Sequence, residues 1–314
     1  MTAPRLVSLI ASSTEIIHAL GLGDYMVGRS HECDFPASVK SLPVCTAPKF
    51  NVDGSSKEID ARVKEILEKS LSVYLVDAEK LDELAPTHVI TQAQCEVCAV
   101  SLKDVQAAAC ELIHSRPEII SLSPNCLEDY FLDLEKVGAS LQVEAAAQTL
   151  IEVSRKRLAE VKEKARRYLC ESGRAPLKVA VIEWIEPLMA AGNWMPELVE
   201  MAGGINLFGE AGRHSPWMDF ASLQSREPDV IIVTPCGFDN ERTLKEMPAL
   251  CNIPGFHDLP AVKNGRLYIA DGNQYFNRPG PRLIDSLEIL SEIFYPQAFP
   301  ARYQESWLNY SRVS

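Results

Sequence analysis

Residues 144–171 read EAAAQTLIEVSRKRLAEVKEKARRYLCE, a stretch of 28 residues that contains neither glycine nor proline. Ala, Leu, Glu, Lys and Arg dominate it, and these are the residues that favour a helix most. Apolar residues recur at helical spacing at Leu150, Val153, Leu158, Val161, Ala165 and Leu169. A helix of this length would extend about 42 Å at about 1.5 Å per residue, longer than a crossover helix in a small α/β unit. We therefore predict a rigid helix between two lobes.

Short apolar runs on both sides of this segment predict buried strands. The first, RLVSLIA at residues 5–11, is followed by SSTE at residues 12–15, which is typical of a helix start. Similar runs occupy residues 72–76, 87–91, 118–122, 178–184, 229–234 and 266–270. Helical or glycine-marked segments separate them, and this alternation predicts an α/β fold with parallel strands.

A weak internal repeat indicates that the two lobes are related. Residues 15–28 can be laid over residues 197–209, because each segment is a helical pattern that ends at glycines before a short apolar element. Likewise APTHVITQ at residues 85–92 is similar to EPDVIIVT at residues 227–234. We expect an N-terminal α/β lobe over residues 1–127, a connecting segment with the long helix over 128–173, and a C-terminal α/β lobe over 174–314.

Composition and charge exclude several classes of protein. The 314 residues are 46% hydrophobic and 24% charged, which is ordinary for a globular protein, and the net charge of −12 argues against a nucleic-acid partner. No apolar run is long enough for a membrane span. The apolar run near the N-terminus is short and interrupted by serines, unlike a signal peptide. We therefore expect a cytoplasmic protein whose nine cysteines are reduced.

Six short motifs follow one another in a characteristic order and spacing. They are VSLIASSTEIIHALGLGDYMVG at 7–28, CDFP at 33–36, PLMAAG at 187–192, SPWMD at 215–219, EPDVII at 227–232 and VKNGRLY at 262–268. Together with the long central helix, they make the chain resemble class III substrate-binding proteins. These are the helical-backbone receptors for cobalamin, heme and ferric siderophores, which serve ABC transporters. The resemblance is closest to the cobalamin-binding branch.

The resemblance implies two Rossmann-like lobes joined by one backbone helix, with a ligand cleft between them at the carboxyl ends of the strands. It implies a binding protein for cobalamin or a related corrinoid or metal chelate, held by aromatic side chains. Trp217 matches a tryptophan that contacts the ring in that branch. Further ligand contacts are expected from Ser12, Ser13, His31, Cys33, Gln92, Trp184, Trp194, Tyr275 and Phe276.

One part of the family pattern is missing. Receptors of this class commonly present a glutamate from each lobe to the permease. The matching stretch of the second lobe, ASLQS at residues 221–225, contains no acid, and in the first lobe only Glu96 lies near the expected place. The sequence therefore argues against docking to a permease.

Four residues are candidate metal ligands because thiolate and imidazole suit soft and borderline metals. They are Cys95, Cys98, Cys236 and His214. Cys95 and Cys98 form a CxxC pair just after a predicted strand, but a structural zinc site normally needs four ligands. Three interpretations stay open for the pair: contact with a metal or ligand, thiol-redox chemistry, or packing in a loop. The alternative function is thus a cytoplasmic metal-binding or thiol-redox protein, with a transition metal ion.

Catalytic motifs do not support an enzyme. The sequence contains no GxSxG, P-loop, HExxH or GxGxxG motif, so hydrolysis by a nucleophilic serine, phosphoryl transfer and dinucleotide binding have no support. We predict a non-catalytic binding protein. Corrinoid, heme and siderophore all remain open as ligands.

Overall fold

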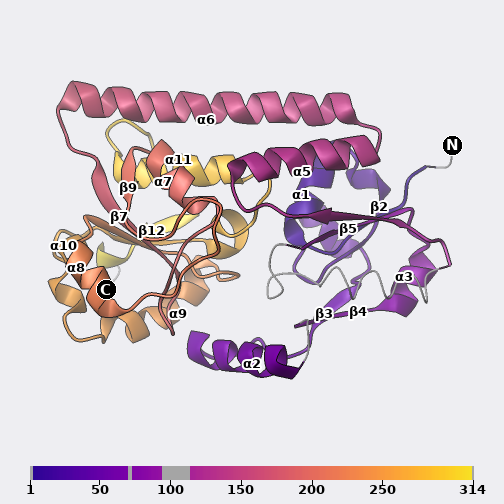
Figure 1. Cartoon of the computed structure of the whole chain (residues 1–314), viewed down its shortest axis with the longest axis horizontal. Helices are drawn as coiled ribbons and strands as arrows, with labels where there is room; N and C mark the ends of the chain where they lie inside the picture. Colours follow the sequence, from indigo (N-terminus) through magenta and orange to yellow (C-terminus); the bar gives the residue numbers. More distant parts are fainter. Residues whose placement is uncertain (1–2, 70–72, 94–113, 313–314) are drawn as a thin grey trace. The chain divides into compact units, whose positions relative to one another are not determined.

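The computed structural model describes residues 3–69, 73–93 and 114–312 (Figure 1). The chain forms two compact units. Unit 1 comprises residues 1–54, 58–124 and 128–153, and unit 2 comprises residues 55–57, 125–127 and 154–314. The boundary after Val153 falls inside the long helix, so the separate connecting segment over 128–173 stays a prediction.

Unit 1 contains a four-stranded sheet with the order β2-β1-β5-β6. The strands are β1 (Leu6–Ser8), β2 (Met26–Arg29), β5 (His88–Gln92) and β6 (Glu118–Leu122), and all neighbouring pairs are parallel. Val7 and Val89 are fully buried in the core between sheet and helices. This agrees with the predicted parallel sheet, since strands covered on both faces are apolar throughout.

Residues 72–76 were predicted as another parallel strand, and this prediction is wrong. Strand β4 (Tyr74–Val76) instead pairs antiparallel with β3 (Thr46–Pro48) in a separate two-stranded sheet. Leu75 is 52% exposed and its neighbours are half-buried, so the segment has one face in solvent. Its apolar composition resembled that of a buried strand, but only one face of the pair is covered.

The sheet of unit 2 repeats the arrangement of unit 1. Its parallel strands run in the order β9-β7-β10-β11, with β8 and β12 added antiparallel. The strands are β7 (Leu177–Trp184), β8 (Met189–Ala190), β9 (Gly204–Asn206), β10 (Val230–Val233), β11 (Leu267–Ala270) and β12 (Trp307–Asn309). Central β10 is buried along its whole length. The equivalent strand order supports the internal repeat predicted from the sequence.

Helices cover the sheets and connect the strands (Figure 1). In the first half of the chain they are α1 (Ala11–Ala19), η1 (Gly23–Tyr25), η2 (Ala37–Ser41), α2 (Ser56–Lys69), α3 (Ala78–Leu84) and α5 (Leu127–Ser140). In the second half they are α7 (Met195–Met201), α8 (Phe220–Arg226), α9 (Asn240–Cys251), η3 (Phe256–Asp258), α10 (Pro260–Lys263), the π-helix η4 (Gly272–Phe276), α11 (Leu283–Phe294) and η5 (Tyr310–Arg312).

Helix α6 (Glu144–Ser172) has 29 residues. It is one unbroken helix (Figure 1). Of the six apolar positions predicted to form its buried stripe, Leu158, Val161 and Ala165 are buried and Leu150 and Leu169 are partly buried. The prediction is wrong for Val153, which is 52% exposed, because the covered stripe runs through Ala147 and Ile151 instead. The α/β architecture with two units and one long helix therefore agrees with the prediction from sequence. The cleft between the lobes stays a prediction. No described helix combines the length and the apolar character that crossing a bilayer requires.

Candidate ligand-binding site

In open α/β sheets, ligands bind at the loops that follow the carboxyl ends of the strands. We therefore consider these loops in each unit separately. In unit 1 they follow β1 and β2, and the segment beyond β5 lies mostly outside the described residues. In unit 2 they follow β7, β10 and β11.

His31 lies just beyond the end of β2 and is held by the start of β3. Its Nδ1 is 2.7 Å from the hydroxyl oxygen of Thr46, and its backbone N–H donates to the same oxygen at 3.1 Å. The imidazole packs against Tyr74 with ring centroids 5.2 Å apart. Burial, followed by the neighbouring charge of Arg29, lowers the pKa of His31. The partly exposed ring is therefore a neutral imidazole near pH 7.

Cys33 belongs to a buried group of small polar side chains in the same unit. Its sulfur accepts a hydrogen bond from the hydroxyl of Thr14 at 2.9 Å, and Thr14 lies on α1. Ser13 and Ser8 place their hydroxyls 2.6 Å apart beside it. Burial raises the pKa of the Cys33 thiol, which keeps it protonated. This group holds the loops after β1 and β2 together.

Ser12, Ser13, Cys33 and Gln92 were predicted to contact the ligand, and the structure places all four inside unit 1. Ser12 and Cys33 are each 1% exposed, Ser13 is fully buried and Gln92 is 3% exposed. We assign Ser13 and Cys33 to positioning of the loops. His31 is the predicted contact of this unit whose side chain reaches the surface.

Trp217 is the most exposed large hydrophobic residue of the described chain, at 56%. Its backbone is nevertheless fixed, because it bridges to Met189 of β8 in antiparallel fashion. On either side, Pro216 accepts from Ala190 N–H and Met218 donates to the carbonyl of Leu188, each at 3.0 Å. A large indole is thus presented to solvent from a rigid segment.

Glu183 and Ser215 lie just beside this segment. The Ser215 hydroxyl donates to the carboxylate of Glu183 at 2.9 Å and accepts the N–H of Gly192 at 3.0 Å. Glu183 lies near the carboxyl end of β7, so the bond ties the Trp217 segment to the sheet. His214 precedes Ser215 and is exposed, with its Nδ1 3.0 Å from the Ser215 carbonyl oxygen.

Trp184 and Phe238 form an aromatic pair where β7 and β10 end. Their ring centroids are 5.3 Å apart, and the Arg242 guanidinium lies 4.8 Å from the Phe238 ring centroid. Cys236 lies in the same loop, and its N–H donates to the Glu183 carbonyl at 3.2 Å. Phe238 was not named as a site residue from the sequence. It nevertheless lies two residues beyond Cys236, in the loop after the carboxyl end of β10, where ligand contacts are expected.

Trp194 and Phe276 pack in the interior of unit 2. They are 5% and 0% exposed, and the indole N–H of Trp194 donates to the Phe276 carbonyl at 2.9 Å. Tyr275, in contrast, is partly exposed, with the Arg282 guanidinium 5.2 Å from its ring centroid. We therefore keep Tyr275 as a candidate contact and assign the other two to holding η4.

The predicted metal ligands are not assembled in the described part of the chain. Cys95 and Cys98 lie outside the described residues. Among residues 3–69, 73–93 and 114–312, no group of three or more His, Cys, Asp or Glu side chains is arranged to hold a metal ion. Cys236 and His214 therefore have no metal site around them in the part that the structure describes.

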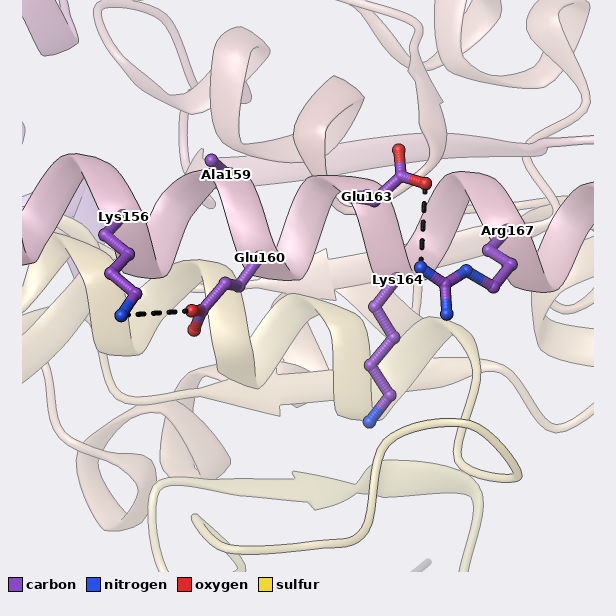
Figure 2. Close-up of a pocket in the computed structure, with 6 residues that line it drawn as sticks. All are labelled: Lys156, Ala159, Glu160, Glu163, Lys164 and Arg167. Atoms are coloured by element: carbon purple, nitrogen blue, oxygen red, sulfur yellow. Dashed lines mark ion pairs between the residues drawn. The ribbon is translucent and has the colours of Figure 1, made fainter.

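An open hollow on the surface of α6 is lined mainly by charged side chains, unlike the aromatic loops of unit 2 (Figure 2). Its lining is Lys156, Ala159, Glu160, Glu163, Lys164 and Arg167, all from this one helix. Two ion pairs cross it, Lys156 to Glu160 at 3.9 Å and Arg167 to Glu163 at 3.8 Å. Exposed pairs of this kind are typical of a solvated helix face. We do not assign a ligand to it.

Comparison with known proteins identifies the family. The model of the family described as "Periplasmic binding protein" matches residues 6–273. The chain belongs to this family. It is 24% identical to the Vitamin B12-binding protein of Vibrio vulnificus strain CMCP6, over 92% of this chain and 89% of that protein.

Two further similarities concern a Bacillus protein and a solved structure. The chain is 24% identical to the uncharacterized ABC transporter substrate-binding lipoprotein YvrC of Bacillus subtilis strain 168, over 94% of this chain and 81% of that protein. The apo periplasmic heme-binding protein RhuT from Roseiflexus sp. RS-1 superposes with a TM-score of 0.68 at 23% identity. It covers 94% of this chain and 99% of that one.

These similarities confirm some predictions and overturn one. The resemblance to substrate-binding receptors is confirmed, and the chain is a periplasmic-type solute-binding protein of a non-catalytic family. The thiol-redox alternative receives no support from them. The predicted cytoplasmic location is wrong, because the family is one of periplasmic proteins and the similar proteins are a lipoprotein and a periplasmic receptor. The apparent lack of a leader was a poor guide to location.

Proposed function

We propose that this protein is a binding protein for a flat metal chelate, and that the chelate is cobalamin or a related corrinoid. The observation that carries the proposal is Trp217, whose indole is 56% exposed on a backbone fixed by its bridge to Met189. Large aromatic side chains on rigid segments bind planar ligands well, because they lose little conformational freedom when the ligand covers them.

Other side chains of unit 2 extend this aromatic surface. Trp184 and Tyr275 are partly exposed; Trp184 is the last residue of β7 and Tyr275 lies in η4 after β11, at the carboxyl edge of the sheet. Because Trp217 is 56% exposed, a ligand that covers it would bury about half of the roughly 150 to 250 Å² that a large aromatic side chain buries in full, worth about 2 to 4 kcal/mol at about 25 cal/mol per Å² before the costs of association.

The choice of a corrinoid over heme rests on the similarity of almost the whole chain to a Vitamin B12-binding protein. Heme is the second candidate, because the solved RhuT structure is that of a heme-binding protein with the same fold. Both ligands are flat, carry a central metal with two axial positions, and would use the same aromatic surface.

Equilibrium dialysis of the purified protein against hydroxocobalamin and, separately, hemin tests the proposal. We expect saturable binding of one hydroxocobalamin per chain at micromolar concentration or below, with hemin bound more weakly. If hemin binds more tightly than hydroxocobalamin, the proposed ligand is a heme and not a corrinoid. Binding of neither compound would refute a role in uptake of flat metal chelates.

A further inference from the structure

We infer that Glu183 determines the class of chelate that this protein binds: its carboxylate favours the amide side chains of a corrinoid and disfavours the propionates of a heme. This inference rests on the proposed function, because it concerns the chelate that covers Trp217. It deepens that function by naming a residue of unit 2 that discriminates between the two candidate ligands.

Glu183 is the extra residue of a bulge near the end of β7. In the antiparallel pairing of β7 with β8, one pair is Ile182 with Ala190 and the next pair along is Trp184 with Met189. Two steps along β7 therefore match one step along β8. Such a bulge breaks the strict alternation of side chains along a strand and redirects a side chain. The irregularity thus places a carboxylate directly before the Trp184 indole.

The two indoles of this edge share one face. Met189 is the residue opposite Trp184 and also the residue opposite Trp217, and both pairings are antiparallel. Side chains directly opposite each other in antiparallel pairs lie on the same face. Trp184, Met189 and Trp217 therefore form a row, and all three are at least partly exposed. A flat chelate that covers this row reaches the end of β7, where Glu183 lies.

A buried serine fixes the Glu183 carboxylate beside this row. Ser215, two residues before Trp217 and 5% exposed, donates its hydroxyl proton to the carboxylate, whose two oxygens are both 2.9 Å away. The Ser215 oxygen accepts the N–H of Gly192 at 3.0 Å. A Cβ on Gly192 would come within 2.7 Å of the Ser215 backbone nitrogen, which favours glycine at this close approach. The half-buried carboxylate is therefore held in a fixed place next to Trp184 and Trp217.

The arginines in the segments beyond the strands of this sheet have polar partners of their own. Each of these partners is an acid or a side-chain amide close by in the sequence. The pairs are Arg213 with Glu210 at 2.9 Å, Arg242 with Glu246 at 3.1 Å, Arg278 with Asn273 at 2.8 Å and Arg282 with Gln274 at 3.2 Å. The charge that is bonded to Ser215 of the Trp217 segment is instead the negative one of Glu183.

The two candidate ligands differ strongly at the edges of their rings. A corrinoid carries primary amides, which donate N–H groups, whereas a heme carries propionate carboxylates. Amide N–H groups donate to carboxylates, and a charged acceptor makes a stronger hydrogen bond than a neutral one. A propionate at the same place would bring two negative charges together where the ligand excludes water, which increases their repulsion. The discrimination needs only the negative charge of Glu183.

Equilibrium dialysis of Glu183→Gln against cyanocobalamin and, separately, hemin tests the inference. Glutamine keeps an acceptor oxygen for the Ser215 hydroxyl and removes the charge. We expect wild type to bind cyanocobalamin more tightly than hemin. Relative to wild type, Glu183→Gln should bind hemin about tenfold more tightly and cyanocobalamin about threefold more weakly. Glu200→Gln, which changes an exposed acid of α7, is the matched control and should keep the wild-type affinities.

A second measurement needs no variant of the protein. In the monocarboxylic acids of cyanocobalamin one amide is hydrolysed to a carboxylate, and the isomers differ in which amide is changed. The isomer whose carboxylate faces Glu183 should bind to wild type at least about tenfold more weakly than cyanocobalamin. In Glu183→Gln the affinity for the same isomer should lie within about threefold of that for cyanocobalamin.

Different failures have different meanings. If wild type binds neither cyanocobalamin nor hemin, the proposed function fails and the inference falls with it. If wild type binds cyanocobalamin but Glu183→Gln has the wild-type affinities for both ligands, only the inference is overturned. Equal binding of cyanocobalamin and of every monocarboxylic acid by wild type would also overturn it, and so would tighter binding of hemin than of cyanocobalamin.

Discussion

Ala85 and Glu227 occupy equivalent positions in the two units, each as the left-handed residue that ends a seven-residue helix. Their φ angles are 43° and 48°. Each helix begins after an aspartate, Asp77 or Asp219, that accepts an N–H from the residue three positions on. A proline follows in both units and leads into a central strand. The internal repeat predicted from the sequence therefore extends to the backbone conformation of these two helices and their ends.

Because a left-handed backbone is strained for residues with a Cβ, Ala85→Gly and Glu227→Gly should each stabilise the protein. We expect the free energy of unfolding to rise by about 0.5 to 1 kcal/mol in urea titrations of each variant. Ala159→Gly, on the exposed face of α6, is the control and should lower it by about 1 kcal/mol. If all three substitutions destabilise alike, the two positions carry no strain.

The parts of the fold predicted correctly are those fixed by local pattern. The long helix over residues 144–171 was within one residue of α6, because 28 residues without Gly or Pro leave few alternatives. The strand predicted at residues 118–122 has the same bounds as β6. The error at residues 72–76 has a different origin, since whether an apolar strand joins the main sheet or an outer pair depends on contacts distant in sequence.

Asp133 should make the stability of the protein depend on pH. It is 8% exposed on α5, and burial raises the pKa of its carboxyl to about 6, against 3.8 for the ordinary group, although Ser123 N–H donates to it. The folded state thus holds the proton more tightly than the unfolded chain. The free energy of unfolding should fall as pH rises from about 4 to about 6, and the loss remains above that range.

Asp133→Asn removes this dependence, because the amide does not ionise. Unfolding in urea at pH 4 should give similar free energies for variant and wild type. At pH 7.5 the variant should be more stable by about 2 kcal/mol. Glu135→Gln, at an exposed position of the same helix, is the control and should leave the wild-type pH profile unchanged. An unchanged profile in Asp133→Asn would contradict the assignment.

Arg157 should contribute strongly to the stability of unit 2. It pairs with Asp285 at 2.8 Å and Glu288 at 2.7 Å, and so ties α6 to α11. Tyr303 donates its hydroxyl to the same two carboxylates at 2.9 and 3.1 Å. These carboxylates are 20% and 14% exposed, so removing the guanidinium would leave two poorly solvated negative charges side by side.

Arg157→Met is therefore expected to lower the free energy of unfolding by about 2 to 3 kcal/mol in urea titrations. The matched control is Arg166→Met, whose partner Glu163 lies in an exposed pair on the same helix. Because that pair is fully solvated, Arg166→Met should leave the free energy of unfolding close to that of the wild type. If the two substitutions change the free energy of unfolding equally, the network around Asp285 and Glu288 contributes no more stability than an exposed ion pair.

The candidate site was less predictable than the fold. Trp217 could be singled out from its motif, and its exposure suits a ligand contact. Trp194 and Phe276 also lie in loops beyond predicted strands, but tertiary packing buries both side chains, and the Trp194 indole bonds to the Phe276 carbonyl. His31 was named from its place after a strand, whereas Thr46, its partner, lies 15 residues away. That pairing depends on how β3 lies beside β2, which no local pattern reports.

The central claim is that an exposed tryptophan on a fixed backbone binds a corrin. Equilibrium dialysis against cyanocobalamin tests it most directly, with wild type, Trp217→Ala and Tyr25→Ala in parallel. Tyr25, 39% exposed just before β2 begins, is a matched exposed aromatic at the opposite edge of its sheet. We predict one cyanocobalamin bound per chain by wild type and Tyr25→Ala, and at least about tenfold weaker binding by Trp217→Ala. No binding by wild type, or equal binding by all three proteins, would contradict the claim.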